Sequence, residues 1–161
     1  MPASRRPPPG PIVSPMSPTD TTTAYLRSKV MSASPEELRL MLLDGALRFA
    51  HQARNGLEAH NPEMTYTGFT QCRAIIAELI NTVNDAAAPE LAAKVKSLYT
   101  FFFTELIQAS LERDAARVDK VIELLEYERE TWTMLMDRLA EERGAGHVSG
   151  SEQAGSISLR A

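Results

Sequence analysis

Residues 30–49 read Val30-Met-Ser-Ala-Ser-Pro-Glu-Glu-Leu-Arg-Leu-Met-Leu-Leu-Asp-Gly-Ala-Leu-Arg-Phe49, and this stretch decides the fold. Ser34 is a good helix N-cap, Pro35 suits the first helical position, and Glu37 stands where it can close a capping box. Two apolar stripes follow at helical spacing. The first comprises Leu38, Met41, Leu42, Gly45 and Phe49, and the second comprises Leu40, Leu43 and Leu47. One stripe is enough to bury a helix against a bundle, so the second indicates deep burial or a partner.

The composition is that of one soluble domain. The chain has 161 residues, of which 43% are hydrophobic, and its net charge is −4. No basic face accumulates, so we expect no nucleic acid or anionic lipid as partner. Cys72 is the single cysteine, which excludes an internal disulfide and fits a cytoplasmic location. No apolar run approaches the ~20 residues of a membrane-spanning helix, so no membrane partner is expected either.

The prolines mark the domain boundaries. They crowd residues 1–23 among Ser and Thr, a composition typical of a disordered arm. The Gly- and Ser-rich residues 144–161 are predicted to form a second disordered tail. Each of the three remaining prolines precedes a long helical pattern, as suits a helix N-terminus. They are Pro35, Pro62 and Pro89. Residues 24–143 are therefore predicted to form one helical domain.

Four helices are expected in that domain, and no segment shows the alternation of a strand. Asn61 can cap the second helix and Asp114 the fourth. The expected helices span residues 35–60, 62–84, 89–112 and 115–142. Because short connections favour antiparallel neighbours, the sequence predicts an all-α fold, an antiparallel up-and-down four-helix bundle with disordered tails.

The sequence offers little support for catalysis. A di-iron bundle needs Glu-x-x-His pairs on two helices, and none occurs. A Gly-rich phosphate loop is absent, as is a nucleophile with an adjacent base. Asp44 stands in an apolar stretch, where a bond to a neighbouring helix or to a chain terminus is favoured over a catalytic role. We therefore expect no catalytic residue, metal or cofactor, and a metal-dependent enzyme is the weakest of the hypotheses.

Binding is better supported by the pattern. The first and third expected helices carry apolar stripes wider than one core face requires. A groove between two such helices could receive the apolar face of another helix. Central burial in the bundle, or burial in a homodimer, would explain the same stripes.

Several motifs resemble those of the flagellin-specific export chaperones, the FliS family. The first is the series Val30-x-Ser-Ala-Ser-Pro-Glu-Glu-Leu38 with Met41-Leu-x-Asp-Gly-Ala46, preceded by Tyr25. Further matches are Phe69-x-x-Cys72-x-x-Ile75-Ile76-x-Glu78-Leu79, Leu98-Tyr99 with Leu106-x-x-Ala109, and Trp132. The resemblance covers about residues 24–140. The chain departs from it at Leu43, where the family usually has an aromatic residue, and at Ser110, where it commonly has Asn.

The resemblance implies a cytoplasmic chaperone that works without ATP. Such proteins bind the disordered C-terminal segment of flagellin, prevent its premature polymerisation and keep it competent for export. The export machinery is a further partner that the resemblance suggests.

We expect the flagellin-binding residues on the surface of the bundle. The candidates are Leu43 and Leu47 from the first helix and Tyr99 and Phe103 from the third. Tyr25 and Val30 would contact the ligand or cover the groove in its absence. The alternative function is a structural or regulatory bundle that self-associates, as a homodimer, through the same stripes.

Overall fold

The computed structural model describes residues 18–152 and divides the chain after Ala33 into two units. The first unit contains helix α1 (Pro18–Ser32). The second contains α2 (Pro35–Glu58), α3 (Pro62–Asn81), α4 (Pro89–Glu112) and α5 (Ala115–Glu152). The predicted all-α class is confirmed, but the described residues form five helices where four were expected.

The two extra stretches of helix overlap the segments predicted to be disordered. Helix α1 begins inside the predicted arm 1–23, and α5 continues past residue 142 as far as Glu152. Threonine hydroxyls of α1 donate to carbonyls one turn earlier, as Thr22 Oγ1 does to Pro18 O at 3.0 Å. This helix buries no residue. The rest of both predicted tails, residues 1–17 and 153–161, lies outside the described residues.

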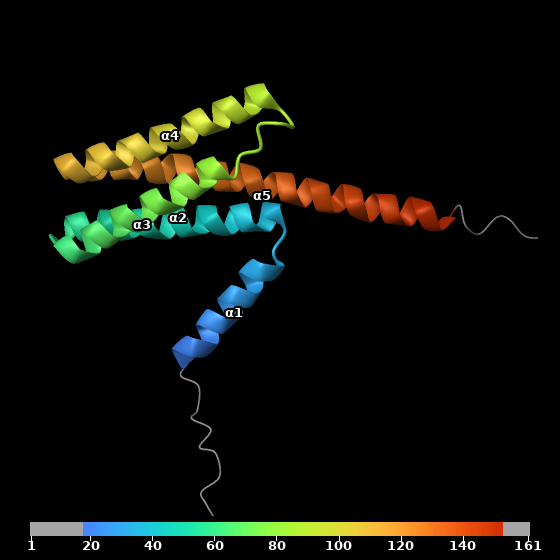
Figure 1. The fold of residues 1–161 in the computed structure, drawn as a ribbon, viewed down its shortest axis with the longest axis horizontal. Helices are drawn as coiled ribbons and strands as arrows, with labels where there is room; N and C mark the ends of the chain where they lie inside the picture. The colour runs from blue at the N-terminus through green and yellow to red at the C-terminus, as the bar shows by residue number, and fades with distance from the viewer. Residues whose placement is uncertain (1–17, 153–161) are drawn as a thin grey trace, which may run out of the picture. The chain divides into compact units, whose positions relative to one another are not determined.

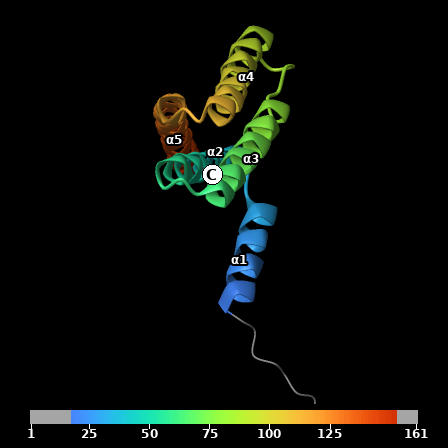
Figure 2. The same cartoon turned by 90° about the vertical axis from the view of Figure 1, so that its left-hand side faces the viewer.

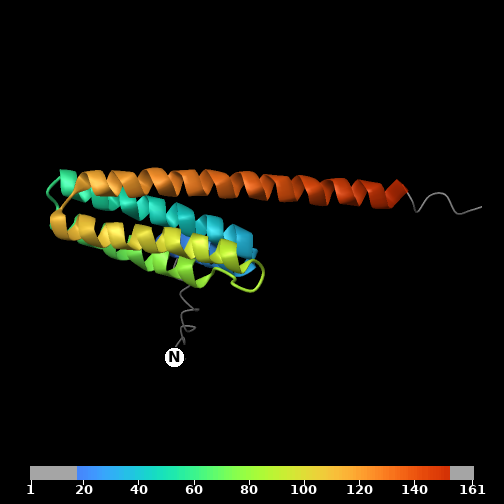
Figure 3. The ribbon, with the colours of Figure 1, turned by 90° about the horizontal axis from the view of Figure 1, so that it is seen from above.

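Helices α2 to α5 pack in a closed ring, which we call the α2–α5 bundle. Helix α2 contacts α3 and α5, and α4 contacts the same two helices. Successive helices run antiparallel (Figure 1), and the end-on view shows the ring (Figure 2). Helix α5 is the longest and runs well past the ends of the other three (Figure 3).

Three helices of the bundle begin at the N-capping residues predicted from the sequence. The Ser34 hydroxyl accepts from Glu37 N at 3.1 Å, and Ser34 N donates to the Glu37 carboxylate at 2.8 Å, which completes the capping box. Asn61 Oδ1 accepts from Met64 N at the start of α3. Asp114 Oδ1 accepts from Ala116 N at the start of α5. Local chemistry therefore sets three of the four helix starts in the bundle.

Helices α2 and α3 approach each other most closely. A Cβ added at Gly68 of α3 would lie 2.3 Å from Ala53 N of α2, and one added at Gly56 would lie 2.5 Å from Thr65 N. Both contacts involve backbone atoms, which cannot swing aside. One turn beyond Gly68, the Cys72 thiol of α3 donates to Ala46 O of α2 at 3.4 Å. Helices α2 and α3 can therefore pack at this short distance only if residues 56 and 68 are glycine.

The face of α2 that enters the core is lined by its second stripe and by small residues. Leu43 and Leu47 are buried, together with Ala46, Ala50 and Ala53. The residues of the first stripe are only half-buried. Larger side chains from the other helices fill the remaining core: Phe69, Ile76 and Leu79 of α3, Tyr99, Phe102 and Leu106 of α4, and Val118, Val121 and Leu125 of α5.

Gly68→Ala should destabilise the bundle, because its Cβ would clash with the backbone of Ala53. We expect the free energy of unfolding, measured by urea denaturation, to fall by about 3 kcal/mol. Gly45→Ala is the matched control, since its Cβ would meet only the flexible end of Ile75 at 3.2 Å. Alanine is the better helix former, so that variant should keep or gain up to about 1 kcal/mol. Equal losses in both variants would contradict the proposed backbone contact.

Candidate functional site

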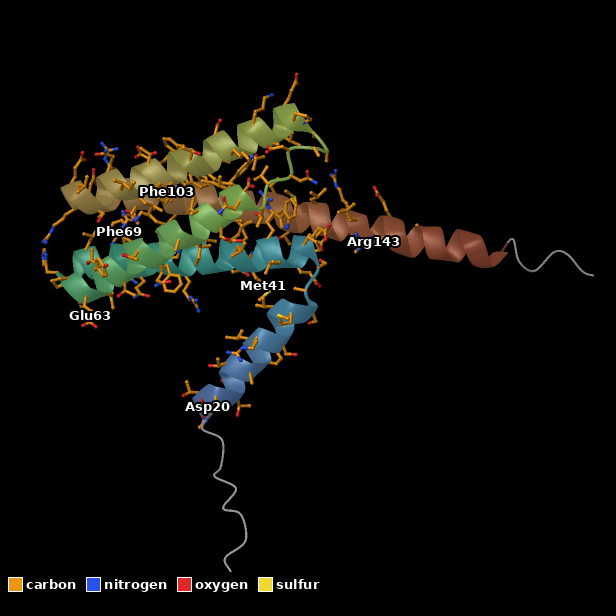
Figure 4. All side chains as sticks on the ribbon, viewed as in Figure 1. Asp20, Met41, Glu63, Phe69, Phe103 and Arg143 are labelled. Atoms are coloured by element: carbon orange, nitrogen blue, oxygen red, sulfur yellow. The ribbon has the colours of Figure 1, made fainter. Side chains whose placement is uncertain are left out.

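The structure places the six predicted binding residues in different environments. Leu43 and Tyr99 are fully buried and Leu47 is 9% exposed, so the prediction that these three lie on the bundle surface is wrong. They belong to the core because α2 presents its second stripe inward and α4 points Tyr99 at the bundle axis. Phe103 is half-buried on α4 (Figure 4). Tyr25 and Val30 of α1 are exposed.

Two polar contacts fix the sides of α4 and α5 that face each other. Tyr99 Oη donates to Glu128 Oε1 at 2.8 Å, and Arg117 Nη1 donates to Glu105 Oε2 at 3.0 Å. Residues seven positions apart lie on the same side of a helix, two turns from each other. The residues seven positions from Glu105 and from Arg117 therefore lie on the facing sides of α4 and α5. On α4 these are Leu98 and, one heptad earlier, Leu91. On α5 the corresponding residue is Leu124.

Further apolar side chains reach the solvent from the same sides, because they lie three, four or seven positions from Leu124, Glu105 and Glu128 respectively. Leu91 is 61% exposed, Phe101 44%, Tyr127 70% and Leu135 43%. Leu98 and Leu124 are half-buried between them and pack against the core. We call these six residues the α4–α5 surface. Helix α4 diverges from its neighbours toward its N-terminus (Figure 1). The set is an unpartnered apolar strip of the kind that receives another helix.

The side of α5 that faces α2 forms ion pairs with that helix. Arg129 Nε donates to Asp44 Oδ1, and Arg54 Nε donates to Asp119 Oδ1 at 3.0 Å. Asp44 was expected to bond to a neighbouring helix, and that expectation is confirmed. The α2–α5 side therefore presents polar pairs, whereas the α4–α5 side presents apolar side chains, with Glu123, Glu126 and Glu130 around Leu124 and Tyr127.

A polar cluster closes the core at the end where α2 begins. Arg39 Nη2 donates to Tyr99 Oη at 2.9 Å, and the Arg39 guanidinium lies 5.4 Å from the centroid of the Tyr99 ring and 4.9 Å from that of Trp132. The Trp132 indole N–H donates to Glu36 O at 3.0 Å. Side chains and backbone of α2, α4 and α5 are thus joined at one point.

No helix within residues 18–152 is both long and apolar enough to cross a membrane. In the same described part of the chain, no three His, Cys, Asp or Glu side chains are grouped to hold a metal ion.

Comparison with known families and proteins shows which of them this chain resembles. The model of the family described as flagellar protein FliS matches residues 18–139, from the first residue of α1 to beyond Trp132 of α5. The chain belongs to the FliS family. The flagellar secretion chaperone FliS of Bacillus subtilis is 29% identical to it over 128 residues, which cover 79% of this chain and 95% of that protein.

Two further FliS proteins are similar over most of their length. The flagellar secretion chaperone FliS of Campylobacter jejuni is 31% identical over 109 residues, covering 68% of this chain and 85% of that protein. Its namesake from Salmonella typhimurium is 31% identical over 111 residues, covering 68% and 82% respectively. The FliS resemblance predicted from the motifs is confirmed, and the family match begins six residues earlier than the predicted residue 24.

Two ionisable groups inside this FliS-family bundle have shifted pKa values. Burial, and next the negative charge of Glu128, raise the pKa of Tyr99 to about 12, while Arg39 acts in the opposite direction. Burial raises the pKa of the Cys72 thiol to about 12. Tyr99 therefore stays a neutral hydrogen-bond donor to Glu128 across the physiological pH range.

Tyr99 should ionise at a higher pH than an ordinary tyrosine in an alkaline titration that is followed by tyrosinate absorbance. We expect a component that ionises near pH 12 and is missing in Tyr99→Phe. Because the pKa of Tyr99 in the folded state lies above the ordinary tyrosine value of 10.0, Tyr99 favours folding at pH values below 10. Its contribution to stability should fall as the pH rises from about 10 to about 12. An unchanged titration curve in Tyr99→Phe would contradict this assignment.

Proposed function

We propose that this chain is a cytoplasmic export chaperone that binds the disordered C-terminal segment of flagellin. In this account it covers apolar faces of the segment, prevents premature polymerisation and keeps flagellin competent for export. Membership of the FliS family supports the proposal, as do relatives named flagellar secretion chaperones. The observation that carries it is the α4–α5 surface, because an apolar strip along two helices suits a ligand that folds into a helix on binding.

The length of the strip matters for a disordered ligand. Such a segment loses conformational entropy when it becomes ordered, so it needs a long apolar contact to offset that loss. From Leu91 to Leu98 and from Leu124 to Leu135 the surface extends over several helical turns. In the proposal, Phe101 and Tyr127 give the largest contacts.

The six binding residues predicted from the sequence have two different roles in the proposal. Phe103, Tyr25 and Val30 are accessible and remain proposed contacts with the ligand. Leu43, Leu47 and Tyr99 are buried, so they would act only by holding the bundle that presents the surface.

Calorimetric titration of the full chain with a peptide of the flagellin C-terminal segment, from the same source, tests the proposal. We expect one-to-one binding with a negative heat-capacity change, the sign of buried apolar surface. Absence of binding by folded protein would contradict it. Concentration-dependent dimerisation in sedimentation would then favour the self-associating bundle.

Charged residues placed on the α4–α5 surface should weaken that binding. Phe101→Glu and Tyr127→Glu each remove apolar contact and bring a carboxylate into the strip, so we expect at least a tenfold rise in Kd. Leu111→Glu is the control, because Leu111 is 74% exposed on α4. It lies six positions after Glu105, so it is off the side of α4 that Glu105 marks. Its Kd should not change. Circular dichroism should show the same helical content in all three variants, and a similar loss of affinity in the control would contradict the assigned surface.

A further inference from the structure

Arg39 stands where the core of the bundle would continue. It precedes Leu43 by four residues and Ala46 by seven, so it lies on the buried face of α2. Its side chain is half-buried among the rings of Tyr99 and Trp132. A guanidinium thus occupies a position that an apolar side chain would ordinarily fill.

The charge of Arg39 has no carboxylate partner among the described residues. Arg54, Arg117 and Arg129 each form an ion pair, whereas no ion pair involves Arg39. Its Nη2 donates to the neutral hydroxyl of Tyr99, and its Nε is buried with no acceptor in the described structure. A half-buried guanidinium with an unpaired donor gains more from an added carboxylate than an exposed one does.

A cavity of about 180 Å³ gives access to this site. It is lined by Pro35, Glu36, Leu38, Arg39, Thr82 and Trp132. Its walls thus come from the start of α2, the residue after α3 and the indole of α5. The volume suits a single side chain or chain end.

Two carboxylates lie near the cavity, and other groups engage both of them. Hydrogen bonds from its own backbone N–H and from Ser34 lower the pKa of Glu36, which ties this carboxylate to the first turn of α2. Glu128 accepts from Tyr99. Neither forms an ion pair with Arg39, so the guanidinium is available to an incoming anion.

We propose that this cavity binds one carboxylate group of the flagellin segment and anchors the segment at Arg39. The inference rests on the function proposed above. The carboxylate would form charge-assisted hydrogen bonds with the guanidinium while its carbon chain packs on Leu38 and Trp132. Two sources share this chemistry, an acidic side chain of the segment and the α-carboxylate at its end.

Three peptides of the flagellin C-terminal segment distinguish the sources. The first is unmodified, the second has an amidated C-terminus, and the third has Asn and Gln in place of its Asp and Glu residues. Each is titrated into the full-length wild-type chain and into Arg39→Met, with calorimetry for Kd. Trp132 is the single tryptophan and lines the cavity, so its fluorescence reports occupancy.

Arg48→Met serves as the matched control. Arg48 lies on the same helix, is exposed, and packs its guanidinium on the Phe49 ring at 4.7 Å, away from the cavity. We expect Arg39→Met to weaken binding of the unmodified peptide at least tenfold and Arg48→Met to leave it unchanged. One of the two neutralised peptides should bind wild type as weakly as the unmodified peptide binds Arg39→Met, without the Trp132 fluorescence change.

That peptide should also bind wild type and Arg39→Met equally, since the group that Arg39 contacts is missing. Equal weakening of all three peptides by Arg39→Met would assign Arg39 to packing alone and overturn the proposal. Wild type that binds all three peptides equally would overturn it as well, while leaving the proposed chaperone function intact. Wild type that binds none of them would overturn the proposed function itself.

Discussion

The backbone contact between α2 and α3 is the constraint on which the rest of the bundle depends. Gly68 and Gly56 allow the two helices to touch with backbone atoms, and Ala46, Ala50 and Ala53 keep the inner face of α2 thin. The inner face of α2 adds little side-chain volume beyond Leu43 and Leu47. Aromatic and large aliphatic residues of α3, α4 and α5 therefore fill the remaining core.

The apolar surface assigned to the ligand lies along α4 and α5. Their inner faces are occupied by Tyr99, Phe102 and Leu125, so Leu98 and Leu124 reach the core only in part. The α2–α5 side has ion pairs instead, including Arg129 with Asp44. One side of α5 thus forms ion pairs with α2. The other combines apolar side chains with Glu123, Glu126 and Glu130, and its apolar residues have no partner helix among the described residues.

Local chemistry in the sequence was enough to predict the helices of the bundle, because caps such as Ser34, Asn61 and Asp114 act on backbone groups within three residues. The binding surface was harder to predict. Alanines mark the core face of α2, so the larger residues of the other stripe gave a misleading picture of which face was buried. Tyr99 looked like a surface aromatic, but its hydroxyl is satisfied by Arg39 and Glu128, sixty and twenty-nine positions away. The heptad relation of Leu91 and Leu98 to Leu124 becomes visible only when the register of α4 against α5 is known.

The most direct test of this account is photo-crosslinking to the flagellin C-terminal segment from a benzophenone amino acid placed singly at Tyr127 or at Leu111. These two side chains are similarly exposed, at 70% and 74%, but only Tyr127 belongs to the α4–α5 surface. The account predicts a crosslinked adduct from position 127 and none from position 111. Equal crosslinking from both positions, or crosslinking from position 111 alone, would contradict it.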